Sequence, residues 1–157
     1  LMSNTAFERA FAVLGDLEAT WRRVCPDGKR NVLKLTFHPD GVREHIVNWR
    51  EMAPLMLLRT RREAESQANE VLAALVDEIL DYPGVLRRWR LQDWHQAPPP
   101  ILPLEYAVGD ARLRLFSMIA TFDTAQDVTA DELRIESFFP ADEGSAALLR
   151  SLASANG

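Results

Sequence analysis

Apolar residues recur at helical spacing in the first half of the chain and at strand spacing in the second half. The first amphipathic segment begins at Thr5, which forms a capping-box pattern with Glu8, and it ends at Gly15. Asp16 is a typical N-cap for a second helix. Residues 31–37 alternate like a strand but also fit a helix capped by their first residue, and we favour the helix. The apolar face of the first helix is Phe7, Ala10, Phe11 and Leu14.

A longer helical region follows this segment. It begins at Asn48, with Glu51 placed three residues later as in a capping box. Pro54 lies far enough inside to predict a kink or a tightened first turn. The polar residues 65–69 interrupt the helix, and the last of them, an asparagine, caps a further helix that ends before Pro83.

The second half of the chain changes character after a proline-rich connection at residues 96–103, which cannot continue a helix. Two alternating segments around Gly109-Asp110 predict a β-hairpin with a two-residue turn, and a third strand and a final helix follow. These elements are expected at residues 101–108, 111–122, 132–139 and 143–154. The pattern predicts an α+β fold in one domain over residues 1–157, with helices packed on a small antiparallel sheet formed mainly by the C-terminal half.

Both faces of the middle strand are apolar in its second half. Leu113, Leu115 and Ile119 point to one side, while Phe116, Met118 and Phe122 point to the other. One face is expected to pack on the helices. The other must meet a ligand, another element of the chain or a second copy of it.

Composition narrows the class of protein. The 157 residues are 47% hydrophobic and 26% charged, as in an ordinary soluble domain, and no apolar run is long enough to span a membrane. The net charge of -5 argues against a chain that grips a nucleic-acid backbone by itself, and the arginine clusters are interpreted as solvated helix faces. The single Cys25 excludes an internal disulfide, so a cytoplasmic location is expected.

The tripeptide His38-Pro39-Asp40 is the signature of the J-domain, a co-chaperone module. A J-domain requires an uninterrupted basic helix before the tripeptide, and Pro26 and Gly28 break that helix here. We therefore interpret the stretch as a turn in which Asp40 caps the next short helix and Phe37 points inward. His38 and His45 do not form a metal-binding pattern, and no catalytic motif is found, so we assign neither metal ligands nor catalytic residues.

One ordered set of residues between positions 31 and 64 resembles the C-terminal ligand-binding domain of MmyB-like transcriptional regulators. The set is Asn31, Phe37, Pro39-Asp40, Asn48-Trp49, Glu51, Leu58-Arg59 and Glu63-Ala64. The closing residues 113–143 are similar to the final hairpin of a branch of that family. The resemblance implies a PAS-like domain that works with an N-terminal helix-turn-helix of the XRE type, which this chain lacks.

The resemblance also implies a function. The domain would bind a fatty acid or another small apolar ligand and no other cofactor. It would form a homodimer and would not contact a membrane. It would contact DNA only through the missing helix-turn-helix. We expect the ligand to lie between the long helix and the sheet, with Arg59 as the partner of a carboxylate head group. The predicted ligand-binding residues are Phe37, Trp49, Met52, Met56, Arg59, Phe116, Met118 and Phe122. Two alternatives remain open, which are a dimerisation module without a ligand and an uncharacterised enzyme.

Overall fold

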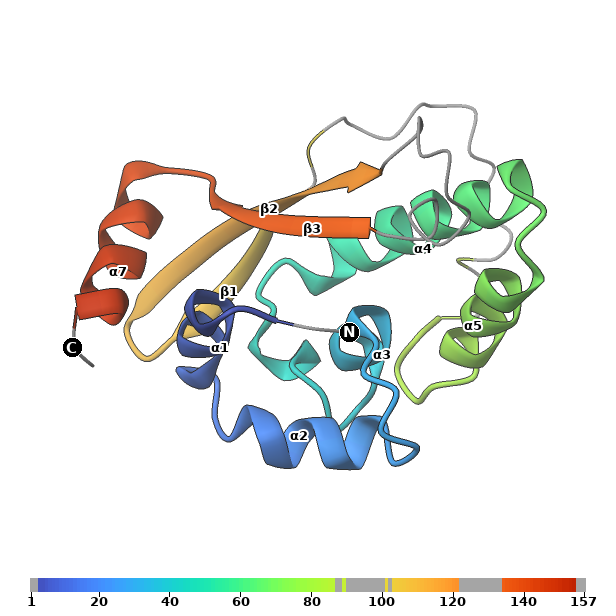
Figure 1. Cartoon of the computed structure of the whole chain (residues 1–157), viewed down its shortest axis with the longest axis horizontal. Helices are drawn as coiled ribbons and strands as arrows, with labels where there is room; N and C mark the ends of the chain where they lie inside the picture. Colours follow the sequence, from blue (N-terminus) through green and yellow to red (C-terminus); the bar gives the residue numbers. More distant parts are fainter. Residues whose placement is uncertain (1–2, 87–88, 90–100, 102, 122–133, 155–157) are drawn as a thin grey trace.

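The computed structural model describes residues 3–86, 89, 101, 103–121 and 134–154, and Figure 1 shows a small sheet lying across a group of helices. The helices are α1 (Thr5–Ala12), α2 (Leu17–Val24), α3 (Val32–Phe37), the 3-10 turn η1 (Arg43–His45), α4 (Trp49–Ser66), α5 (Glu70–Leu80) and α7 (Glu143–Ser154). The strands are β1 (Leu104–Val108), β2 (Ala111–Thr121) and β3 (Arg134–Pro140). The α+β class, with the sheet supplied by the C-terminal half, is confirmed.

Three of the predicted helix caps are confirmed. The side chain of Asp16 accepts a hydrogen bond from the backbone of α2, and Asn69 does the same for α5. Asn31 accepts from two backbone N–H groups of α3, so residues 32–37 form a helix and not a strand. A side-chain oxygen at this position satisfies backbone donors that have no partner inside the helix.

The capping box predicted for the first helix is wrong. The N-cap of α1 is Asn4, whose Oδ1 accepts from the backbone N–H of Phe7 at 2.8 Å. The carboxylate of Glu8 instead accepts from the hydroxyl of Ser3 at 2.9 Å. Asparagine is the better cap of the two neighbouring candidates, and the helix therefore includes Thr5 as its first residue.

The capping box predicted for the long helix is also wrong. Asn48 precedes α4 but makes no side-chain hydrogen bond to it. Its amide instead reaches β1, where Nδ2 donates to the carbonyl of Pro103 at 2.9 Å and Oδ1 accepts from the backbone N–H of Glu105 at 3.0 Å. The backbone N–H of Val47 adds a 2.7 Å bond to the carbonyl of Glu105. These contacts form a seam between residues 46–48 and the sheet.

The turn around His38 is confirmed, but Asp40 does not cap the next helix. That helix, η1, follows Val42 and has no side-chain cap. The imidazole of His38 holds the turn, because its Nδ1 accepts from the backbone N–H of Asp40 at 3.1 Å. The chain then passes so close to α3 that a Cβ on Gly41 would overlap the carbonyl oxygen of Leu35. Glycine is therefore required at this position.

The sheet has the strand order β1-β2-β3 and is antiparallel throughout. Val108 pairs with Ala111 across the predicted two-residue turn, which confirms the hairpin. Leu113 and Leu115 are buried against the helices, and the pairing of Phe116 with Phe139 places those two rings on the opposite face. The proline-rich connection, the end of the second predicted strand and the start of the third lie outside the described residues, apart from positions 101, 103 and 121.

Two groups of buried side chains hold the helices and the sheet together. The first cluster joins α1, α2, α3 and the sheet, and it includes Phe11, Trp21, Leu35, Tyr106 and Leu113. The second cluster joins α3, α4, α5 and the segment after α5, and it contains Phe37, Ala53, Leu57, Val76, Ile79, Leu80, Val85 and Trp89. Trp49, at the start of α4, packs against both clusters.

Candidate functional site

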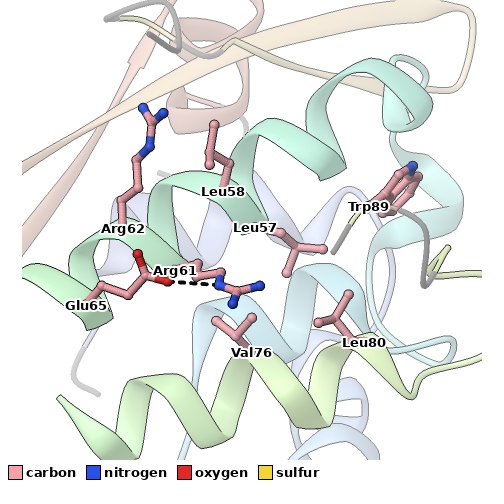
Figure 2. A pocket seen from close by; sticks show the side chains of 8 residues that line it. All are labelled: Leu57, Leu58, Arg61, Arg62, Glu65, Val76, Leu80 and Trp89. Atoms are coloured by element: carbon pink, nitrogen blue, oxygen red, sulfur yellow. Dashed lines mark hydrogen bonds and ion pairs between the residues drawn. The ribbon is translucent and has the colours of Figure 1, made fainter. Parts of the chain in front are cut away.

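A groove of about 270 Å³ lies between α4 and α5 (Figure 2). Helix α4 supplies its residues at spacings of one, three and four, which keeps them on one side of the helix. Helix α5 supplies two residues that are four positions apart. The lining is Leu57, Leu58, Arg61, Arg62 and Glu65 from α4, Val76 and Leu80 from α5, and Trp89.

The floor of the groove is apolar. Leu57, Leu58, Val76 and Leu80 are all at most 5% exposed, and Trp89 is also buried. In Figure 2, Leu80 and Trp89 lie towards one end and Arg62 and Glu65 towards the other, while the guanidinium of Arg61 lies between them, beside Leu57 and Val76 in this view. The groove therefore has an apolar end and a charged end.

The charged end is formed by Arg61, Arg62 and Glu65 of α4. Nε of Arg61 donates to Oε1 of Glu65 at 3.0 Å, one helical turn away, and both side chains are at least half exposed. A pair this exposed contributes little to stability, about 0.2–1 kcal/mol. The guanidinium of Arg61 therefore lies at the groove and can exchange Glu65 for another anionic partner at little cost in stability.

A second hollow, of about 280 Å³, is polar and lies where the α1–α2 junction meets the turn around His38. Its lining includes Asp16, Arg23, Asp40, Glu44 and His45. Across the residues that the structure describes, no three His, Cys, Asp or Glu side chains gather as a metal ion would need. His38 itself packs its ring edge-on against Tyr82 at 5.0 Å, which is a structural contact.

The chain matches the family model described as the MmyB-like transcription regulator ligand binding domain over residues 1–152. The chain belongs to this family. No curated protein and no solved structure matches it. Of the described helices, none combines the length and the apolar character that a membrane span requires.

Within this member of the MmyB-like family, four of the predicted ligand-binding residues lie in or beside the core. Phe37 is fully buried, and its ring packs edge-on against Trp49 at 5.0 Å. Met56 packs against the second cluster, and Met52 is buried on α4. The structure thus brings Phe37, Trp49 and Met56 together, as parts of the packing of the helices.

Arg59 is exposed on α4. It is two residues before Arg61, a separation that turns an α-helix by about 200°, so Arg59 lies on a different side of the helix from the groove. Desolvation raises the pKa of Glu136 on β3, although part of its surface is exposed, and a hydrogen bond from Ser117 and the positive charge of Arg59 oppose that rise. Arg59 therefore lies near enough to β3 for its charge to act on Glu136, whereas Arg61 lines the groove between α4 and α5.

Phe116 and Met118 lie on the sheet face that points away from Leu113 and Leu115. Phe116 stacks on Phe139 at 5.6 Å, and Met118 is 59% exposed. The structure therefore does not gather these two with Trp49 and Met56, and Phe122 is outside the described residues. The ligand-binding role of all these residues stays a prediction.

The groove residues were missed by reasoning from the sequence. Leu57, Arg61 and Glu65 recur every four residues, and Val76 and Leu80 have the same spacing, so a shared stripe on each helix was visible. The sequence does not show that α4 and α5 lay these two stripes side by side.

Proposed function

We propose that the chain is the ligand-sensing, PAS-like domain of a cytoplasmic bacterial XRE-family transcriptional regulator. It binds a small apolar ligand such as a fatty acid and modulates DNA binding by a helix-turn-helix outside this chain. The observation that carries this proposal is the groove between α4 and α5, which joins an apolar floor to an arginine rim. Membership of a family of ligand-binding regulator domains supports it.

A ligand in this groove contacts two helices that are linked to the rest of the domain. Helix α5 is tied to α3, because Nζ of Lys34 donates to Glu78 at 2.8 Å. The segment after α5 is tied to η1, because Arg43 donates to the carbonyl of Pro83 at 2.6 Å. Two conformations of the domain can differ in the distance between α4 and α5. A ligand that binds one of these conformations more tightly than the other increases the population of that conformation. Only such a difference in affinity can alter DNA binding.

The test is to purify the chain, extract it with organic solvent and analyse the extract by mass spectrometry. The delipidated chain is then heated with a panel of fatty acids and other small apolar compounds. A co-purified ligand, or a compound that raises the melting temperature in proportion to its occupancy, supports the proposal. A chain that yields no ligand and shows no thermal shift with any compound would falsify it.

One observation favours a second function, homodimerisation through the outer face of the sheet. Met118, Ile135 and Phe139 are 59%, 47% and 40% exposed there, beside the stacked Phe116. Grouped apolar side chains of this kind mark interaction surfaces. Light scattering of the Met118→Glu variant tests this, with Val71→Glu on α5 as a control, because Val71 is 82% exposed. A dimer that Met118→Glu dissociates and Val71→Glu does not would support this second function.

A further inference from the structure

We propose that the turn at residues 38–41 is a proton-operated latch, in which one proton taken up by Nδ1 of His38 breaks a hydrogen bond from Asp40 and loosens the start of α4. The His-Pro-Asp tripeptide of this turn stands out in the sequence, and the proposed function makes no use of it. The latch goes beyond the proposed function and does not depend on a ligand.

The imidazole of His38 can hold the turn in only one protonation state. Its Nδ1 accepts from the backbone N–H of Asp40 at 3.1 Å, so this nitrogen carries no proton and the proton of the neutral ring is on Nε2. A proton that binds Nδ1 turns it from an acceptor into a donor, and the bond from Asp40 breaks. The side chains of His38 and Asp40 are 23% and 63% exposed, so water can deliver the proton and can solvate the released N–H. Imidazole takes up a proton in the range of about pH 5 to 8.

Two carboxylates lie where they can attract the charged ring. Oδ2 of Asp40 is 3.8 Å from Nδ1 of His38, so a small rotation of the ring brings the two into a charge-assisted hydrogen bond. The second carboxylate is Glu78 on α5. Desolvation raises the pKa of Glu78, but hydrogen bonds from Lys34 and Tyr82 and the charges of Lys34 and His38 lower it overall. Glu78 therefore stays ionised over the range in which an imidazole titrates.

Lys34 and Tyr82 hold Glu78 beside the ring of His38. Nζ of Lys34 donates to Oε1 of Glu78 at 2.8 Å, and the hydroxyl of Tyr82 donates to the same oxygen at 2.6 Å. The ring of Tyr82 also meets the imidazole edge-on at 5.0 Å, so a rotation of the imidazole changes a contact with α5. The charged and titratable groups of the surrounding elements are Asp40 from the turn, Lys34 from α3, Glu78 and Tyr82 from α5, Arg43 from η1 and Cys25 from the end of α2.

The turn is connected to the start of α4 through Trp49. Phe37 precedes the turn, and its ring packs edge-on against Trp49 at 5.0 Å. Arg43 follows the turn, and its guanidinium lies 5.6 Å from the centroid of the Trp49 ring. Trp49 is therefore held by the residues on both sides of the turn. Since packed side chains transmit displacements, a change in the turn alters the packing of Trp49, the first residue of the helix that lines the groove.

The experiment is a pH titration of the isotope-labelled chain, followed by NMR from about pH 8 to about pH 5. The signals to follow are the ring nitrogens of His38, the backbone amide of Asp40 and the indole N–H of Trp49. At the alkaline end, Nδ1 of His38 is expected without a proton and Nε2 with one. As the pH falls, the signals of Asp40 and Trp49 should shift with the same midpoint as the ring of His38.

Two substitutions of histidine by asparagine form a matched pair. Asparagine accepts from the backbone N–H two residues later and favours a turn before proline, so His38→Asn keeps the bond from Asp40 but cannot take up a proton. The shifts of Asp40 and Trp49 should disappear in this variant. His45→Asn removes the other histidine of the same segment, whose Nε2 lies 3.7 Å from Glu44, and it should leave the shifts unchanged. A melting curve confirms that each variant is folded.

Three results would overturn the inference. A proton on Nδ1 of His38 at the alkaline end removes the acceptor on which the latch depends. An indole signal of Trp49 that does not move while His38 titrates shows that the turn is not coupled to α4. Shifts that persist in His38→Asn belong to another group. The first two results need no variant, so a variant that does not fold leaves the test intact. None of the three concerns ligand binding, so the proposed function stands or fails separately.

Discussion

The amide of Asn48 offers the sharpest test of how the helical half of the domain is joined to the sheet. The asparagine precedes α4, where sequence alone assigns it as an N-cap, but its side chain bonds to the backbone at Pro103 and Glu105. These two interpretations predict different responses to the same substitution. Aspartate is as good an N-cap as asparagine, whereas it cannot donate a hydrogen bond.

The magnitude follows from the two bonds. Asn48→Asp keeps an acceptor for the N–H of Glu105 but turns an oxygen towards the carbonyl of Pro103, where the amide donated at 2.9 Å. Loss of a partner for a half-buried polar group costs about 1–3 kcal/mol, and Asn48→Ala, which removes both bonds, costs about 2–4 kcal/mol. For a domain of this size, 1 kcal/mol lowers the melting temperature by about 2–4 °C.

The assay is urea or thermal unfolding of Asn48→Asp and Asn48→Ala beside Asn69→Asp, in which a true N-cap is exchanged for another. Asn69 accepts from the backbone N–H of Leu72 at 2.9 Å, so Asn69→Asp should change stability by less than about 0.5 kcal/mol. Asn48→Asp should cost clearly more than Asn69→Asp. If the two aspartate variants are equally stable, the role assigned to Asn48 at the seam is refuted.

Three further substitutions test other contacts. Gly41→Ala should destabilise the domain by at least about 3 kcal/mol, seen as a lower urea midpoint, because its Cβ meets the carbonyl oxygen of Leu35; unchanged stability would contradict the close approach. Ser145 is 1% exposed and its hydroxyl accepts from the backbone N–H of Arg114 at 2.9 Å, so Ser145→Ala should cost about 1–3 kcal/mol in the same assay. Hydrogen bonds from the backbone and side chain of Ser145 lower the pKa of Asp142 below 3.8. The stability that the Asp142 carboxylate contributes is therefore present above pH 3.8 and is lost as the pH falls through the lowered pKa. The dependence of the urea midpoint on pH below 5 should be shallower in Asp142→Asn, and equal slopes in the two proteins would count against this assignment.

Local chemistry was enough to predict most of the fold. Asp16, Asn31 and Asn69 cap helices because each precedes an apolar periodic segment and can satisfy donors only a few residues away. The turn at Gly109-Asp110 is equally local, and it fixed the register of the hairpin.

Contacts between distant segments could not be predicted in this way. Asn48 has the local pattern of a cap, and only the presence of β1 beside it redirects the amide. The same limit applies to the site. Arg59 and Arg61 belong to the same charged stretch of α4, and the local sequence does not distinguish them. Which of the two faces a groove depends on where α5 packs against α4.

The two core clusters imply an order of folding. The second cluster is built from residues 33–89, a contiguous part of the chain, and it can close as soon as α5 has formed. The first cluster cannot do so, since Phe11 packs against Tyr106 and Phe138, which come about a hundred residues or more later in the chain. In pulse-labelled hydrogen exchange during refolding, the amides of α4 and α5 should therefore gain protection before those of α1. On the ribosome, α1 emerges before α4 and α5 but has to wait for the sheet, so it is packed after two helices that are synthesised later.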